Sequence, residues 1–158
     1  MKLYLVRHGE AKSKSEDPTR PLNGMGLRNA NTMAAWMRKA GESAAEIRHS
    51  GKKRAEQTAE IFGNHLSPPH GVLSTPGLKP NDDILPAVDM LDGLQDPLMI
   101  VGHLPFLSKL TSYLVTGEQD TEVVRFQNAG VVCLVGEQGH WSVAWVVAPS
   151  LIMPESRK

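Results

Sequence analysis

The chain has 158 residues, 41% of them hydrophobic and 22% charged, and its 17 basic side chains balance 17 acidic ones. These values predict one soluble domain, residues 1–158, and the zero net charge argues against a protein that binds nucleic acid or a membrane surface. The apolar stretches are all shorter than the ~20 residues of a membrane span. Cys133 is the only cysteine, which excludes a disulfide or a cysteine-based zinc framework within the chain. We therefore expect a cytoplasmic protein.

The neutral total conceals two halves of opposite charge. Residues 1–66 carry 12 Lys and Arg against 7 Asp and Glu, whereas residues 67–158 carry 5 against 10. A basic N-terminal half suits a protein that binds an anionic ligand there, although solvated surface charges would give the same count.

The first predicted element is a short apolar strand with phosphate-binding side chains at its end. Residues 3–6 have β-branched and aromatic character, which predicts a buried strand, and Arg7-His8-Gly9 follows directly. The glycine would let a ligand approach the backbone closely. Polar residues, prolines and glycines over 11–26 predict a loop that contains Arg20. An ordinary polar turn with a surface histidine fits this stretch equally well.

Two amphipathic helices with a strand between them come next. Residues 27–39 place apolar side chains three and four apart, which predicts a helix. Residues 46–50 predict a second strand, and residues 51–62 predict a second helix with Ser50 near its start. Ser50 suits either a helix cap or a direct contact to an anion.

The middle of the chain is expected to be irregular. Residues 63–83 are rich in proline, glycine, serine and histidine and predict a loop with a short strand at Val72-Leu73. Asp82 or Asp83 then caps a predicted helix over residues 84–94.

The second clear apolar strand also ends in a histidine. Residues 97–103 are apolar up to Gly102-His103, and Pro105 begins the next predicted helix. Three later segments predict consecutive strands: 122–127, 130–135 and 141–147.

The alternation of strands and helices predicts an α/β fold with three layers, α/β/α. The sheet should be mixed but mostly parallel, with hairpin-like strands near the C-terminus. Ligands of open α/β sheets bind beyond the C-terminal ends of the strands. Arg7, His8, Ser50 and His103 all lie at such ends in the predicted fold.

Three motifs over residues 3 to about 105 resemble the histidine phosphatase superfamily, with its phosphoglycerate-mutase-like fold. They are Arg7-His8-Gly9, the run from Ser50 through Arg54 to Ala59, and Gly102-His103. The short chain, the segment Arg20-Pro21-Leu22 and the run Gly102-His103-Leu104-Pro105 resemble the SixA-type phosphohistidine phosphatases, a minimal form of that fold.

The resemblance implies the roles of the site residues. His8 would be the nucleophile that forms a covalent phosphohistidine, and His103 would face it across the phosphate. Arg7 and Arg54 would bind the phosphoryl oxygens, which suits the planar fork of a guanidinium group. The expected substrate-binding residues are Arg20, Ser50 and Gly9.

The resemblance also implies a substrate class: phosphohistidine on a partner protein of the phosphorelay type. We expect no cofactor and no metal, because the remaining histidines show no ligand spacing.

The general acid is missing from the pattern. Many superfamily members carry an acid between the second and third motifs, where this chain has residues 77–83, and Asp82 is a candidate although a helix cap explains it equally. This departure fits a P–N substrate, whose ring nitrogen is protonated without a strong dedicated acid. The alternatives are a small-molecule phosphate-ester phosphatase and a phospho-binding module without turnover.

Overall fold

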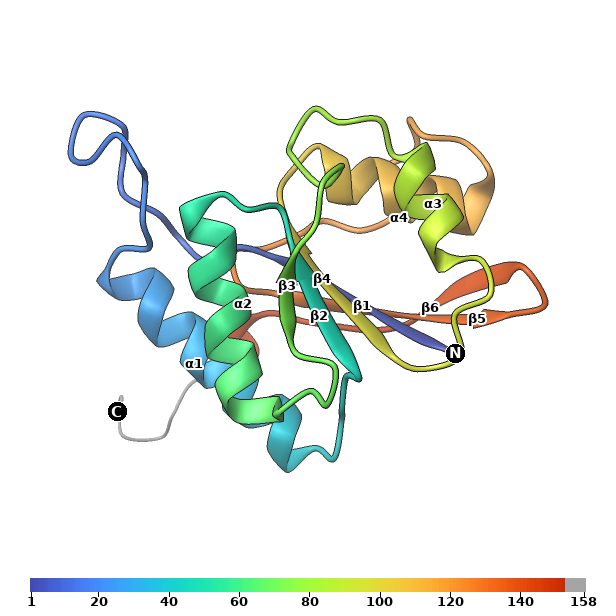
Figure 1. Ribbon diagram of the computed structural model, residues 1–158, viewed down its shortest axis with the longest axis horizontal. Coiled ribbons are helices and arrows are strands. Elements are labelled where there is room, and N and C mark those ends of the chain that lie inside the picture. The colour runs from blue at the N-terminus through green and yellow to red at the C-terminus, as the bar shows by residue number, and fades with distance from the viewer. Residues whose placement is uncertain (153–158) are drawn as a thin grey trace.

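The computed structural model describes residues 1–152, in which six strands form one sheet (Figure 1). The strands follow the order β3-β2-β4-β1-β5-β6 across the sheet. The first four run parallel, whereas β5 and β6 are antiparallel to their neighbours, so the expected mixed, mostly parallel sheet is confirmed. The bounds are β1 (Lys2–Arg7), β2 (Glu46–His49), β3 (Val72–Ser74), β4 (Leu98–Gly102), β5 (Val131–Glu137) and β6 (His140–Val147).

Helices cover both faces of the sheet and complete the expected three layers. On one face lie α1 (Gly24–Lys39) and α2 (Lys53–Leu66), and on the other lie α3 (Leu85–Leu91) and α4 (Phe106–Thr116) (Figure 1). A short 3₁₀ turn, η1 (Pro149–Leu151), ends the described chain.

Alternate side chains of β1 enter two separate hydrophobic cores. Leu3 and Leu5 pack in the core beneath α3 and α4, whereas Tyr4 and Val6 pack in the core beneath α1 and α2. Each of these four residues is at most 1% exposed. Because successive residues of a strand point to opposite faces, a strand covered on both sides needs a continuous apolar run. This burial holds the end of β1, and the residues that follow it, on a rigid support.

The segment 122–127 is not a strand, contrary to the prediction. β1 already has β4 and β5 as its neighbours in the sheet, which leaves this segment no place beside it. Its apolar pattern reflects core packing instead, since Phe126 is 4% exposed. The Phe126 carbonyl accepts a hydrogen bond from Nη1 of Arg7 at 3.1 Å.

Three helices differ in length from the prediction. α1 begins three residues earlier because the Asn23 side chain caps it, accepting the Gly26 N–H at 2.8 Å. α2 continues to Leu66, beyond the predicted end at residue 62. Gly63, in this added turn, packs closely against β3, since a Cβ at this position would come 2.6 Å from Cγ2 of Val72. α3 covers only seven residues and stops shortly before Gly93, whose φ of +80° is unsuited to a helix.

The C-terminal ends of β1, β2 and β4 meet at one edge of the sheet. Arg7 pairs with Gly102 in the register of β1 and β4, and His49 pairs with Val101 in that of β2 and β4. The His8 N–H extends the first pairing by donating to the Gly102 carbonyl at 3.0 Å. Residues that follow these three strands are therefore neighbours in space.

Candidate active site

One cavity of about 330 Å³ opens at this edge of the sheet. Its walls include five of the seven residues expected from the sequence: Arg7, His8, Arg20, Arg54 and His103. They come from the ends of β1 and β4, the loop before α1 and the first turn of α2. The fold thus brings together side chains that are up to about a hundred residues apart in the chain.

His8 is held with one ring nitrogen bound and the other free. Its Nδ1 lies 2.7 Å from the Gly9 carbonyl, and because a carbonyl only accepts, Nδ1 carries the hydrogen. Nε2 of the neutral ring therefore keeps its lone pair. Burial lowers the pKa of His8 to about 4, and the nearby Arg54 and Arg7 charges act in the same direction. The ring is neutral at pH 7, as a nitrogen nucleophile requires.

His103 lies beside His8, with the ring centroids 5.0 Å apart and the planes inclined by 53°. Its Nε2 is 2.6 Å from Oγ of Ser50, whereas its Nδ1 is buried without a partner among residues 1–152. Burial, reinforced by His8 and Arg54, lowers the pKa of His103 to about 3. An unsatisfied buried nitrogen costs free energy, and a phosphoryl oxygen in the cavity would satisfy it.

Acid should destabilise the protein because of these two histidines. An unfolded histidine titrates near pH 6.5, whereas the folded pKa values of His8 and His103 are about 4 and about 3, so the unfolded chain binds more protons below pH 6.5. Stability therefore falls as the pH decreases, by about 2 kcal/mol for each histidine between pH 7 and pH 5. Thermal unfolding measured across this range tests the prediction. His8→Asn should remove roughly half of the loss, and a wild-type Tm that stays constant would contradict it.

Arg7 and Arg54 place two unpaired cations around the histidines. Nε of each is buried without a hydrogen-bond partner among the described residues, and burial lowers the pKa of both groups. None of the ion pairs within residues 1–152 involves either side chain. Buried cations are normally paired, and guanidinium groups donate paired hydrogen bonds to phosphate oxygens. The arrangement is that of an anion site.

Arg20 reaches the same cavity from the loop before α1. Its backbone lies in the left-handed region with a φ of +49°, which is uncommon for a residue other than glycine. Its Nε donates to the Lys12 carbonyl at 3.0 Å, which fixes the guanidinium group. The charge of Arg20 also lowers the pKa of His8, His103 and Arg54, as a third cation of the same site would.

Gly9, which we expected to contact substrate, lies behind the cavity. Its N–H donates to Oγ1 of Thr58 at 3.0 Å, and the same hydroxyl donates to the Arg54 carbonyl at 2.8 Å. A Cβ on Gly9 would come 3.0 Å from the Gly26 carbonyl oxygen. Close packing against the start of α1 therefore favours glycine at this position. The expected contact between Gly9 and a substrate stays a prediction.

Ser50 also lies outside the cavity lining. Its hydroxyl contacts His103 and accepts the Lys52 N–H at 3.3 Å. The residue that precedes α2 is Lys52, and its side chain makes no capping hydrogen bond. The side chain of Ser50 is therefore not the cap of α2. It contacts the imidazole of His103, and a direct contact between Ser50 and an anion stays a prediction.

Two amides that the sequence interpretation missed hold the backbone of the site. Oε1 of Gln57 accepts the Leu22 N–H at 2.7 Å, which ties the loop that carries Arg20 to α2. Nδ2 of Asn128 donates to the His8 carbonyl at 3.2 Å. Gln57 lies within the second sequence motif, which was a usable signal, whereas the segment around Asn128 has none.

The carboxylate in the cavity lining is Glu10, which sequence reasoning did not single out. Its Oε1 accepts Nδ2–H of Asn23 at 3.1 Å. Asp82, the acid considered from the sequence, lines a neighbouring groove, and its Oδ2 accepts the Lys79 N–H at 2.9 Å. Asp83 instead accepts the first N–H of α3 at 3.0 Å.

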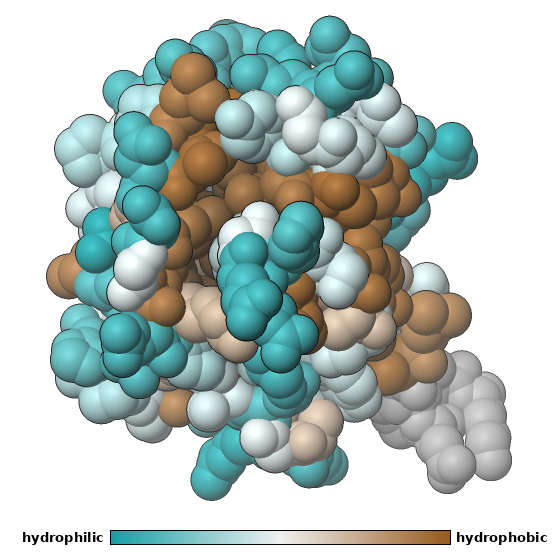
Figure 2. Space-filling view, turned by 90° about the vertical axis from the view of Figure 1, so that its right-hand side faces the viewer, coloured by the Kyte–Doolittle hydropathy of each residue, from teal (hydrophilic) through white to brown (hydrophobic). Residues whose placement is uncertain are grey.

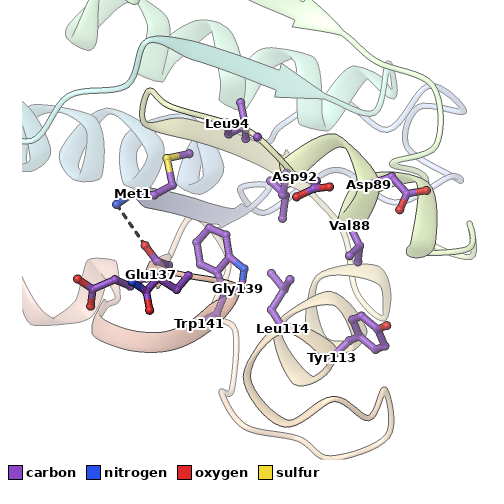
Figure 3. Close-up of a pocket in the computed structure, with 14 residues that line it drawn as sticks. Met1, Val88, Asp89, Asp92, Leu94, Tyr113, Leu114, Glu137, Gly139 and Trp141 are labelled. Atoms are coloured by element: carbon purple, nitrogen blue, oxygen red, sulfur yellow. Dashed lines mark hydrogen bonds between the residues drawn. The ribbon is translucent and has the colours of Figure 1, made fainter.

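A second cavity, about 490 Å³ in volume, lies near the start of β1 between α3, α4 and the β5–β6 turn. Figure 2 shows apolar side chains gathered around a hollow on this face of the molecule. Trp141 and Leu114 line the cavity, and Asp89, Asp92 and Glu137 add carboxylates (Figure 3). Its described lining has three carboxylates and no His, Lys or Arg side chain, and this charge disfavours a phosphate.

No helix within residues 1–152 combines the length and apolarity that crossing a membrane requires. No group of three or more His, Cys, Asp or Glu side chains in the same part of the chain is arranged to hold a metal ion. Cys133 is buried in β5 as a free thiol.

Comparison with known proteins gives a consistent result. Residues 3–79 match the family model of the histidine phosphatase superfamily, branch 1. The structure of the protein histidine phosphatase SixA in complex with tungstate is similar to this chain, with a TM-score of 0.84 and 26% identity over 97% of this chain and 100% of that chain. A comparison with curated proteins found no match.

Two further structures share the fold at lower identity. A protein from Agrobacterium tumefaciens that carries the name phosphohistidine phosphatase SixA has a TM-score of 0.77 at 20% identity, over 94% of this chain and 97% of that chain. The α-ribazole phosphatase from Shigella flexneri has a TM-score of 0.76 at 15% identity, over the same shares of the two chains. The three ordered motifs converge on one cavity, residues 3–79 match the family model, and the chain shares the fold of these structures, so the chain is similar in motifs and in fold to the histidine phosphatase superfamily.

Proposed function

We propose that this phosphatase hydrolyses phosphohistidine on a partner protein, through a covalent phosphohistidine formed at His8. The observation that carries the proposal is the neutral His8 ring, whose Nε2 is free in a cavity lined by three guanidinium groups. The similarity to a SixA protein histidine phosphatase at 26% identity supports the substrate class.

The reaction has two displacement steps at phosphorus. Nε2 of His8 attacks the phosphorus, and the P–N bond of the substrate breaks with its electron pair going to the substrate imidazole, which takes a proton from solvent. Water then attacks the phosphorus, the electron pair of the His8–phosphorus bond returns to Nε2, and inorganic phosphate leaves while one proton of the water passes to solvent. Arg7, Arg20 and Arg54 neutralise charge on the phosphoryl oxygens in both steps.

His103 would act as a hydrogen-bond donor to the transferring group. A bound phosphoryl group brings negative charge next to a ring whose pKa is otherwise lowered to about 3. That charge opposes the effects of burial and of the neighbouring cations, and therefore raises the pKa again. Nδ1, which is buried and has no hydrogen-bond partner among residues 1–152, can then donate to a phosphoryl oxygen.

Protonation of the leaving group distinguishes phosphate esters from phosphohistidine as substrates. An ester needs an acid near the departing oxygen, whereas the imidazole of phosphohistidine accepts a proton on its ring. Asp82 lies outside the cavity lining, which favours the P–N substrate. Glu10 does line the cavity, which keeps a small-molecule phosphate-ester phosphatase as the second candidate.

Trapping of the phosphoenzyme tests the proposal. The protein is mixed with a ³²P-phosphohistidine peptide and quenched within milliseconds in alkaline detergent, which preserves a P–N bond. We expect label on the wild-type chain that is stable to base, labile to acid and located at His8, together with release of phosphate. Absence of trapped label and of phosphate release would overturn the proposal. A higher kcat/KM for p-nitrophenyl phosphate than for the peptide would favour the second candidate.

A further inference from the structure

A strongly basic groove, about 700 Å³ in volume, adjoins the catalytic cavity. The two share Arg20, Arg54 and Pro80 in their walls and are therefore continuous. The loop that carries Lys14 on one wall of the groove projects beyond the sheet (Figure 1). Six cationic side chains line the groove against one carboxylate, Asp82; the cations are Lys14, Arg20, Lys52, Lys53, Arg54 and Lys79.

Few of these charges are neutralised by the protein itself. Among the ion pairs of residues 1–152, one involves a cation of the groove: Lys53 with Glu56 at 3.7 Å, between two exposed side chains. The acids nearest to Lys14 in sequence are engaged elsewhere. Glu16 and Asp17 accept hydrogen bonds from serine and threonine of their own loop. The groove therefore presents a surplus of positive charge to whatever enters it.

The lining offers charge but little apolar surface. Pro18 and Pro80 are its apolar residues, and it has no aromatic side chain that would stack on a nucleobase or another organic ring. A carboxylate-rich ligand fits such a surface better than a small organic phosphate does.

The burial of His8 and His103 indicates that the ligand of the groove is part of the same molecule as the phosphohistidine. His8 and His103 are 8% and 1% exposed, so a phosphohistidine must reach into the cavity to meet them. Its own backbone and the neighbouring side chains then lie over the rim, which is where the basic groove begins.

We propose that the basic groove binds an acidic protein segment that flanks the phosphohistidine, and that this contact selects the partner. The inference rests on the proposed function and adds a determinant of specificity to it. Electrostatic complementarity of this kind raises the association rate and discriminates against partners of the wrong charge, and salt screens it.

The test uses the full chain and three phosphohistidine peptides of equal length. In one peptide the residues that flank the phosphohistidine are glutamates, in the second they are glutamines and in the third they are lysines. The wild-type kcat/KM should be about tenfold higher for the glutamate peptide than for the glutamine peptide, and lowest for the lysine peptide. Raising the ionic strength to about 0.5 M should largely abolish the preference.

Charge reversal then locates the effect. Lys14→Glu and Lys79→Glu, in different segments of the wall, should each lower the glutamate-to-glutamine ratio several-fold, mainly through KM, and together bring it close to one. Lys39→Glu at the end of α1 adds the same charge away from the groove and should keep the wild-type ratio. Hydrolysis of phosphoramidate by each variant reports whether its catalytic centre is formed.

The outcomes separate this inference from the proposed function. Equal kcat/KM for the three peptides, or a preference that survives both reversals, overturns the groove as a specificity determinant. If the double reversal weakens inhibition by tripolyphosphate but leaves inhibition by an acidic peptide that lacks phosphohistidine unchanged, the inference is overturned as well, in favour of a small polyanion. If the wild-type protein hydrolyses none of the peptides, the proposed function itself fails.

Discussion

Replacing His8 with asparagine should reduce phosphate release from a phosphohistidine peptide by about 10⁴-fold or more. Asparagine retains an N–H group that can donate to the Gly9 carbonyl, the contact that Nδ1 of His8 makes at 2.7 Å. It has no basic nitrogen to attack phosphorus, so the loss should appear in kcat. Single-turnover phosphate release and the absence of trapped label on the variant provide the measurement.

The His8→Asn variant should still bind an oxyanion, because Arg7, Arg20 and Arg54 are unchanged. Tungstate or phosphate should therefore raise its Tm about as much as that of the wild type. The matched control is His140→Asn, since His140 is exposed on β6 and lies outside the cavity lining. Turnover of the His8 variant within tenfold of the wild-type rate would show that another group is the nucleophile.

The convergence of Arg7, His8, Arg54 and His103 could be predicted from the sequence. Each lies at or just beyond the end of a strand in the parallel part of the sheet, or in the helix that follows one, and parallel strands bring such ends to one edge. The apolar run of β1 and its burial on both faces follow from the same local pattern. Local periodicity therefore suffices for the framework of the site.

The contacts behind the site could not be predicted, because they depend on how distant segments meet. The need for glycine at position 9 arises from a helix that begins fifteen residues later, where Gly26 leaves no room for a side chain. The hydroxyl of Ser50 contacts the imidazole of His103, which lies 53 residues later in the sequence. Neither relation leaves a periodic or spacing signal.

The error over residues 122–127 has a related cause. An alternating apolar pattern indicates one buried side of a segment but does not say which backbone groups will pair. Here the apolar side packs in the core, and the Phe126 carbonyl accepts from Arg7 instead of from a strand. Sheet membership was decided by β5, which occupies the remaining side of β1.

Replacing Arg54 should affect activity and stability in opposite directions. Arg54→Ala should lower kcat/KM for phosphohistidine peptides by about 10³-fold, since it removes a donor aimed at the charge of the transferring group. Arg54→Lys should lose about 10²-fold, because it keeps the charge but loses the planar fork. The free Arg54→Ala protein should nevertheless be more stable than the wild type by a few degrees in Tm. Within the described part of the chain, Nε of Arg54 is buried without a hydrogen-bond partner, and the charge of Arg20 lies near it.

Phosphate should reverse this order of stability. A bound oxyanion pairs with the guanidinium groups, so it should raise the Tm of the wild type more than that of Arg54→Ala. Arg38→Ala, an exposed arginine in the last turn of α1, is the matched control and should change neither the rate nor the phosphate effect. If Arg54→Ala lowers both the rate and the Tm of the free protein, Arg54 stabilises the fold itself. Contacts within the protein, rather than the phosphoryl group, would then offset the repulsion between Arg20 and Arg54.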